Sequence, residues 1–154
     1  MRKTTLIRLA LCVLLASAWI GTAQANWCNV NGGGVAFGAY DPTSSGNINA
    51  TGSLDMQCNS VFNVVLSVSV GNGTGASYSS GRKMTRAGGG TLIYNIYADA
   101  ARTQVLGDGT GGSVTLHISG HNTYTQAIWA RIFGNQRTAQ AGSYTDIVVA
   151  TISY

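Results

Sequence analysis

The chain has 154 residues, of which 9% are charged, against roughly 25% in average proteins, and 21 are glycine, about twice the usual share. Nine Lys and Arg stand against five acidic residues, all of them Asp, and three of the nine lie near the N-terminus, which leaves the rest nearly neutral. This balance excludes an electrostatic nucleic-acid binder and a strongly acidic protein. It is typical of a secreted, glycine-turned, all-β structural domain.

Residues 1–25 have the pattern of a secretory signal peptide. Arg2, Lys3 and Arg8 form a positive start, Leu9–Ile20 is the apolar run, and Ala23-Gln24-Ala25 is a small-x-small cleavage pattern. Cleavage after Ala18 is the alternative. The apolar run is too short for a membrane span, and no later segment has spanning length. We therefore expect an exported mature domain of residues 26–154, without a membrane span.

Three cysteines divide in the same way. Cys12 lies inside the signal segment, whereas Cys28 and Cys58 remain in the mature chain. An even pair in an exported chain predicts one disulfide, which would close a loop of about 30 residues and stabilise the fold by ~3–4 kcal/mol. Two cysteines and two histidines lack metal-ligand spacing, so we expect no metal site and no cofactor.

Short strand patterns recur along the mature chain, with turn residues between them and no sustained helical period. Glycine and serine enrichment predicts a long loop at Gly71–Gly90. The expected strands are Val35–Tyr40, Asn47–Cys58, Val61–Val70, Thr91–Ala98, Gln104–Leu106, Val114–Ser119, Thr125–Phe133 and part of Gly142–Tyr154. This spacing favours an immunoglobulin-like or Greek-key β-sandwich.

The last stretch, Gly142–Tyr154, organises the functional prediction. Its second half alternates with the period of a half-buried strand, and we expect no later strand to cover it. The predicted sandwich would then have an open edge with unpaired backbone groups. The residues expected to line the resulting groove are Val148, Ala150, Ile152 and Tyr154 of the last strand, with Val64, Leu66 and Val68 opposite.

Several motifs, in this order and spacing, give the mature chain a family resemblance. They are Val35–Pro42 after Cys28, Gly52–Cys58, Gly81–Met84, Leu92–Tyr97 with Asp99 and Arg102, Val105–Gly109, Ala130–Ile132 and Ala141–Asp146. The chain resembles the spore coat protein U domain, found in pilins of the archaic chaperone–usher pathway. The resemblance implies an incomplete immunoglobulin-like sandwich that lacks its last strand. A periplasmic chaperone would fill the gap first, and a neighbouring pilin subunit would replace it after passage through the outer-membrane usher.

Polymerising members of this family carry an alternating donor segment before the first cysteine. Cleavage after Ala25 would leave only Asn26 and Trp27 there. Two residues reach less than ~7 Å in extended form, against ~17–20 Å for an ordinary strand. We therefore expect a strand acceptor at a terminal position in a pilus, exported through the inner membrane to the periplasm and then to the cell surface.

Other chemistries have weaker support. His117 and His121 flank a turn without a nearby carboxylate, and the aspartates occupy turn or cap positions, so we expect no enzyme. Arg82, Lys83 and Arg86 form a basic cluster without interleaved aromatic residues, which favours a solvated loop over a nucleic-acid site. Two readings stay open beside the pilus subunit. One is a free-standing surface or spore-coat protein, and the other is a small carbohydrate-binding adhesin that uses the tyrosines and tryptophans.

Overall fold

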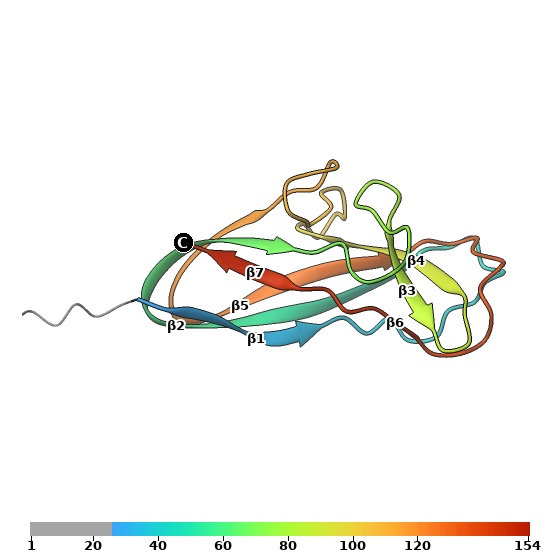
Figure 1. The fold of residues 1–154 in the computed structure, drawn as a ribbon, viewed down its shortest axis with the longest axis horizontal. Helices are drawn as coiled ribbons and strands as arrows, with labels where there is room; N and C mark the ends of the chain where they lie inside the picture. The colour runs from blue at the N-terminus through green and yellow to red at the C-terminus, as the bar shows by residue number, and fades with distance from the viewer. Residues whose placement is uncertain (1–25) are drawn as a thin grey trace, which may run out of the picture.

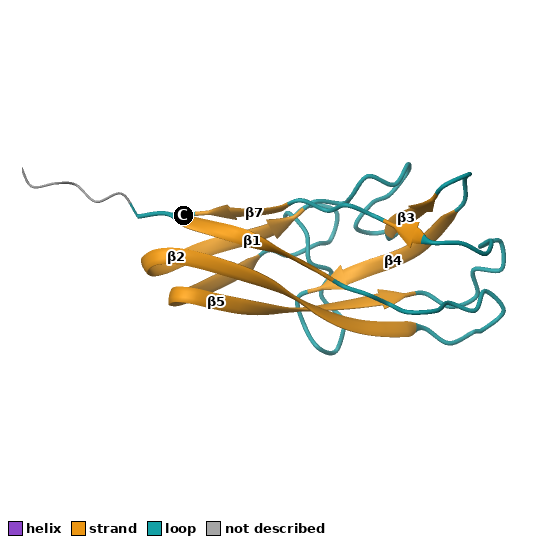
Figure 2. Cartoon of the chain, turned by 90° about the horizontal axis from the view of Figure 1, so that it is seen from below, coloured by secondary structure: helices purple, strands orange, loops and turns teal. Residues whose placement is uncertain are grey.

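A computed structural model describes residues 26–154, so the predicted signal peptide lies outside the described residues. These residues form seven β-strands and no helix (Figures 1 and 2). The strands are β1 (Cys28–Gly34), β2 (Ile48–Val68), β3 (Arg82–Arg86), β4 (Thr91–Tyr97), β5 (Leu116–Ile132), β6 (Tyr144–Thr145) and β7 (Ala150–Ser153). No helix with the length and apolar character that a membrane crossing needs occurs in this part of the chain.

Two long antiparallel strands, β2 and β5, form the frame of the fold. They pair from Ile48↔Ile132 to Leu66↔Leu116, with an irregularity between Gln57 and Val61. Figures 1 and 2 show both strands turning back at one end of the molecule, near the start of β1 and the C-terminus. The sheet is thereby curled into two layers, and the all-β, immunoglobulin-like sandwich is confirmed.

The wide layer has the strand order β1-β2-β5-β4-β3-β6 and uses the first half of β2 with the second half of β5. The narrow layer contains the other halves of β2 and β5, with β7 paired to β2 from Val65↔Ser153 to Val68↔Ala150. Both strands β1 and β7 therefore pair with β2, but on different halves of it.

The core lies between the layers and follows the alternation that the sequence predicts. Met56, Val64, Leu66 and Ile132 are at most 2% exposed, and Ile118 and Ile128 are buried beside them. The predicted disulfide is present: Cys28 and Cys58 are directly opposite residues of β1 and β2, with sulfurs 2.01 Å apart. It joins the start of β1 to β2 within the wide layer.

Several expected strand boundaries are wrong. Asn47–Cys58 and Val61–Val70 belong to one strand, β2, because a bulge between Gln57 and Val61 carries the ladder around the bend. The expected strands Val114–Ser119 and Thr125–Phe133 likewise merge into β5.

Three further regions differ from expectation. Val35–Tyr40 has half-buried residues at Val35, Phe37 and Tyr40 but joins no ladder, and Gln104–Leu106 makes only isolated bridges. The expected loop Gly71–Gly90 contains β3, whose backbone is fixed by pairing to β4. β1 was not expected at all, because its sequence of Asn and Gly has low strand propensity.

Candidate functional site

A groove opens between the two segments that bound the sandwich on one side. One wall is β1 with the residues that follow it, and the other is the segment from β6 to β7. The cavity measures about 580 Å³. Its lining includes Val30, Gly32, Gly33, Gly34, Val35 and Phe37 on the first wall, Tyr144, Thr145, Asp146, Ile147, Val148 and Ala150 on the second, and Leu54, Val68, Met84, Tyr94, Ile96 and Ile128 on the floor.

The strands on both walls are paired on one side only. Among the described residues, β1 pairs only with β2, and β7 pairs only with β2 (Figure 1). Their other edges hold backbone N–H and C=O groups without a ladder partner. Such edges bind an additional extended chain readily.

The groove continues past β1. A second cavity of about 510 Å³ lies between residues 35–42 and 139–144 and shares Val35, Phe37, Met84 and Tyr144 with the first. Phe37 stands at the junction, with its ring centroid 5.9 Å from that of Tyr94 in an edge-to-face contact. The two cavities are therefore adjacent, and most of the side chains that line the first are apolar.

Close backbone contact between β1 and β2 shapes the first wall. A Cβ on Gly52 would lie 1.9 Å from the carbonyl oxygen of Gly34, and a Cβ on Gly33 would lie 2.1 Å from that of Ser53. These glycines let the chain after β1 run across β2, so that Val35 and Phe37 reach the groove.

Among the described residues, Asp146 is the only charged one that lines either cavity. Its carboxylate accepts hydrogen bonds from the Tyr94 hydroxyl at 2.8 Å, from the Asn72 amide at 2.9 Å and from the Ile147 amide at 2.8 Å. Burial, with the adjacent carboxylate as the second cause, raises the pKa of Tyr94 above its usual value. Asp146 therefore anchors the second wall to the β2–β3 loop and to β4.

The residues predicted for the groove are only partly brought together. Val68, Val148 and Ala150 line it. Val64 and Leu66 are 1% and 0% exposed and belong to the closed core. Ile152 is half-buried and packs against the core, whereas Tyr154 is 79% exposed. The alternation of the last segment is as predicted, since residues 148, 150 and 152 are half-buried and residues 149, 151 and 153 are exposed.

The residues of the first wall and most of those on the floor were not predicted as parts of a groove. Val30 is half-buried between two exposed asparagines, but the glycines at positions 32–34 concealed the strand. Met84, Ile96 and Ile128 lie on strands that could not be assigned to the floor before their neighbours were known.

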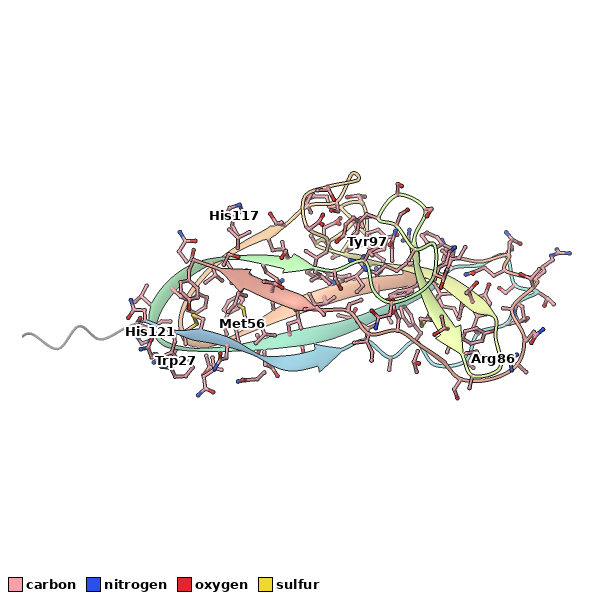
Figure 3. All side chains as sticks on the ribbon, in the orientation of Figure 1. Trp27, Met56, Arg86, Tyr97, His117 and His121 are labelled. Carbon is pink, nitrogen blue, oxygen red and sulfur yellow. A yellow bond between two sulfur atoms is a disulfide. The ribbon has the colours of Figure 1, made fainter. Side chains whose placement is uncertain are left out.

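The histidines and aspartates considered for metal binding or catalysis do not come together in a site. His117 and His121 are both exposed and lie apart (Figure 3), and residues 26–154 contain no group of three metal-ligating side chains. Asp41, Asp99 and Asp108 accept backbone and hydroxyl hydrogen bonds in turns, which lower the pKa of each carboxyl.

The three basic residues Arg82, Lys83 and Arg86 do not form one exposed cluster, because the alternation of β3 turns Arg82 inward. Arg82 is fully buried, while Lys83 and Arg86 are half-buried. Arg86 lies at the end of the molecule opposite Trp27 (Figure 3). Tyr94 and Tyr97 are buried, so the tyrosines do not gather on one exposed face.

Fold and site together define a disulfide-bonded β-sandwich domain with an open apolar groove beside its last strand. The spore coat protein U domain matches residues 14–151, and the chain belongs to that family. No curated protein matches the chain.

A solved structure shows the same fold. It is the pre-assembly complex of the CsuC chaperone with the CsuE tip adhesion subunit, from archaic chaperone–usher Csu pili of Acinetobacter baumannii. The TM-score is 0.57 at 16% identity, and the match covers 84% of the present chain. The present chain spans only 40% of that solved chain.

Proposed function

We propose that this chain is a secreted, non-enzymatic structural subunit of a chaperone–usher surface pilus, assembled by accepting a β-strand in its groove. The observation that carries the proposal is the mainly apolar groove between β1 and β7, two strands that each pair on one side only. Membership of the spore coat protein U family and likeness to a chaperone–subunit complex support it.

Strand addition would satisfy both features of the groove. The backbone of an incoming extended segment would hydrogen-bond the free edge of β7, and its alternate side chains would enter the cavity over Leu54, Met84 and Ile128. The apolar lining would then be removed from water, which stabilises the complex by ~25 cal/mol per Å² of apolar area covered.

The proposed partners follow from this mechanism. A periplasmic chaperone occupies the groove after export, an outer-membrane usher passes the subunit on, and the N-terminal segment of a neighbouring pilin replaces the chaperone strand at the cell surface. The proposal includes a terminal position as strand acceptor. Trp27 supports it, because its backbone is bound to Asn59 by two hydrogen bonds of 3.0 and 3.1 Å beside the disulfide.

The test uses the exported chain, expressed with and without the chaperone of its own pilus system. We expect a stable one-to-one complex with the chaperone and, in its absence, degradation or a weakly stable monomer that binds an extended alternating peptide. N-terminal sequencing of the exported product fixes the cleavage site.

Two results would contradict the proposal. A highly stable monomer that ignores both chaperone and peptide would support a free-standing coat protein. Glycan binding by such a monomer would support an adhesin.

A further inference from the structure

The β2–β7 ladder ends in an unusual way at the second wall of the groove. Its register pairs Val68 with Ala150, so the next pair in line is Ser69 with Val149. Half of that pair is regular, since the Ser69 amide donates to the Val149 carbonyl at 2.8 Å. In a regular antiparallel pair the Val149 amide would donate to the Ser69 carbonyl in return.

That return bond is replaced by a side chain. The Val149 amide donates instead to the Ser69 hydroxyl at 2.8 Å. The Ser69 carbonyl accepts from the guanidinium of Arg82, whose Nε lies at 3.1 Å and whose Nη2 lies at 3.0 Å. Arg82 thus takes the acceptor that the ladder would have used.

Arg82 depends strongly on this carbonyl. It is fully buried, and no carboxylate of residues 26–154 lies within ion-pair distance of it. Its remaining partners are the carbonyls of Leu106 at 2.7 Å and Val68 at 3.4 Å, with the ring of Tyr78 5.1 Å away. Burial removes a guanidinium from water, and where no carboxylate pairs with it, hydrogen bonds to carbonyl oxygens stabilise its charge.

We propose that Arg82 is a positioning residue for the groove. By holding the Ser69 carbonyl, it ends the β2–β7 ladder at Val149. The chain before Val149 then leaves β2, is anchored through Asp146 to the Asn72 amide at 2.9 Å, and reaches β3, where β6 pairs. This path sets residues 144–148, the part of the second wall that does not pair with β2, in place before any strand arrives. The consequence for binding rests on the proposed function, whereas the hydrogen-bond switch does not.

The first test is amide hydrogen exchange of Val149 in the exported chain without a partner. We expect Ser69→Ala to speed exchange of this amide about five- to tenfold, because its acceptor is gone and the carbonyl of residue 69 stays bound to Arg82. Ser69→Thr keeps a hydroxyl and should restore protection. Ser67→Ala is the matched control, since the Ser67 hydroxyl has only a 3.5 Å contact with the Thr151 carbonyl.

The second test repeats Ser69→Ala in an Arg82→Met background. Here the carbonyl of residue 69 is free to accept the Val149 amide, so loss of the hydroxyl should no longer change the exchange rate. Arg82→Lys, which keeps the charge but not the paired donors, serves the same comparison if the Met variant does not accumulate. Equal acceleration in both backgrounds, or none in the wild type, would overturn the inference.

The binding consequence is measured with a 13-residue peptide of alternating Val and Thr. We expect Ser69→Ala to weaken peptide binding severalfold and Ser69→Thr to restore it, while both keep the melting temperature of Ser67→Ala. Unchanged binding by Ser69→Ala would show that the switch does not preset the wall. Absence of any binding by the wild-type chain would count against strand acceptance, and the exchange pattern would still decide whether Arg82 controls the ladder.

Discussion

Ala150→Asp separates the stability of the chain from its ability to accept a strand. Ala150 is half-buried on the second wall, where it lines the cavity beside Val68. In the free groove an aspartate at this position can still turn toward water. In a filled groove it would be covered by the incoming strand, with no basic residue among those that line the cavity.

The magnitude follows from burying an unpaired charge. Leaving an uncompensated charge in a closed apolar site costs about 3–5 kcal/mol, and each 1.4 kcal/mol is about tenfold in affinity. We therefore expect strand capture by Ala150→Asp to weaken by at least about 100-fold. Unfolding of the free chain should shift by much less, because its groove remains open to water.

The assay is titration with the alternating Val/Thr peptide, followed by denaturant unfolding of each free variant. Thr151→Asp is the matched control: it adds the same charge one residue later, on the exposed face. We expect near-wild-type capture by the control. Equal losses in the two variants, or the larger loss in Thr151→Asp, would refute the assignment of the second wall.

Three further measurements test the framework of the groove. Replacing both Cys28 and Cys58 by serine should lower the free energy of unfolding by ~3–4 kcal/mol, measured in denaturant, since the bond spans a sequence separation of 30. Gly52→Ala should cost about 1–3 kcal/mol, because its Cβ would lie 1.9 Å from a β1 carbonyl oxygen, whereas Gly46→Ala, with only an ordinary 3.5 Å contact, should change stability little. The raised pKa of Tyr94 means that the fold favours its neutral form, so stability should be full below pH ~10 and fall as the pH rises above it, less steeply in Tyr94→Phe.

The parts of the fold that the sequence predicts are those where local pattern and tertiary environment agree. Residues 148, 150 and 152 alternate with exposed neighbours in the last segment, and Val64, Leu66 and Val68 of β2 are buried while Val65 and Ser67 between them are half-buried. A half-buried or inward-facing strand imposes this period directly on its side chains. The disulfide could also be predicted, because two cysteines remain in the predicted exported domain and only one pairing is possible.

The first wall could not be predicted because its structure is imposed by its neighbours. The Asn and Gly residues of β1 have little strand propensity, and pairing with β2 and the Cys28–Cys58 bond hold them extended. Val35–Tyr40 was expected to be a strand because it is a short apolar segment, and Val35 and Phe37 are half-buried. Its apolar composition could not reveal that this segment pairs with no strand and instead borders the groove.

Arg82 shows how a charge can mislead sequence reasoning. Beside Lys83 and Arg86 it has the composition of a solvated loop, yet in β3 alternation turns Arg82 and Met84 inward together. Its acceptors are backbone carbonyls of Val68 and Ser69, at and just after the end of β2, and of Leu106 after β4. Every residue has a backbone carbonyl, so the sequence does not show which ones will bind an arginine. Because the Ser69 carbonyl is bound by Arg82, the Ser69 hydroxyl accepts the Val149 amide in its place. These two residues together fix where the β2–β7 ladder stops and where the second wall leaves β2.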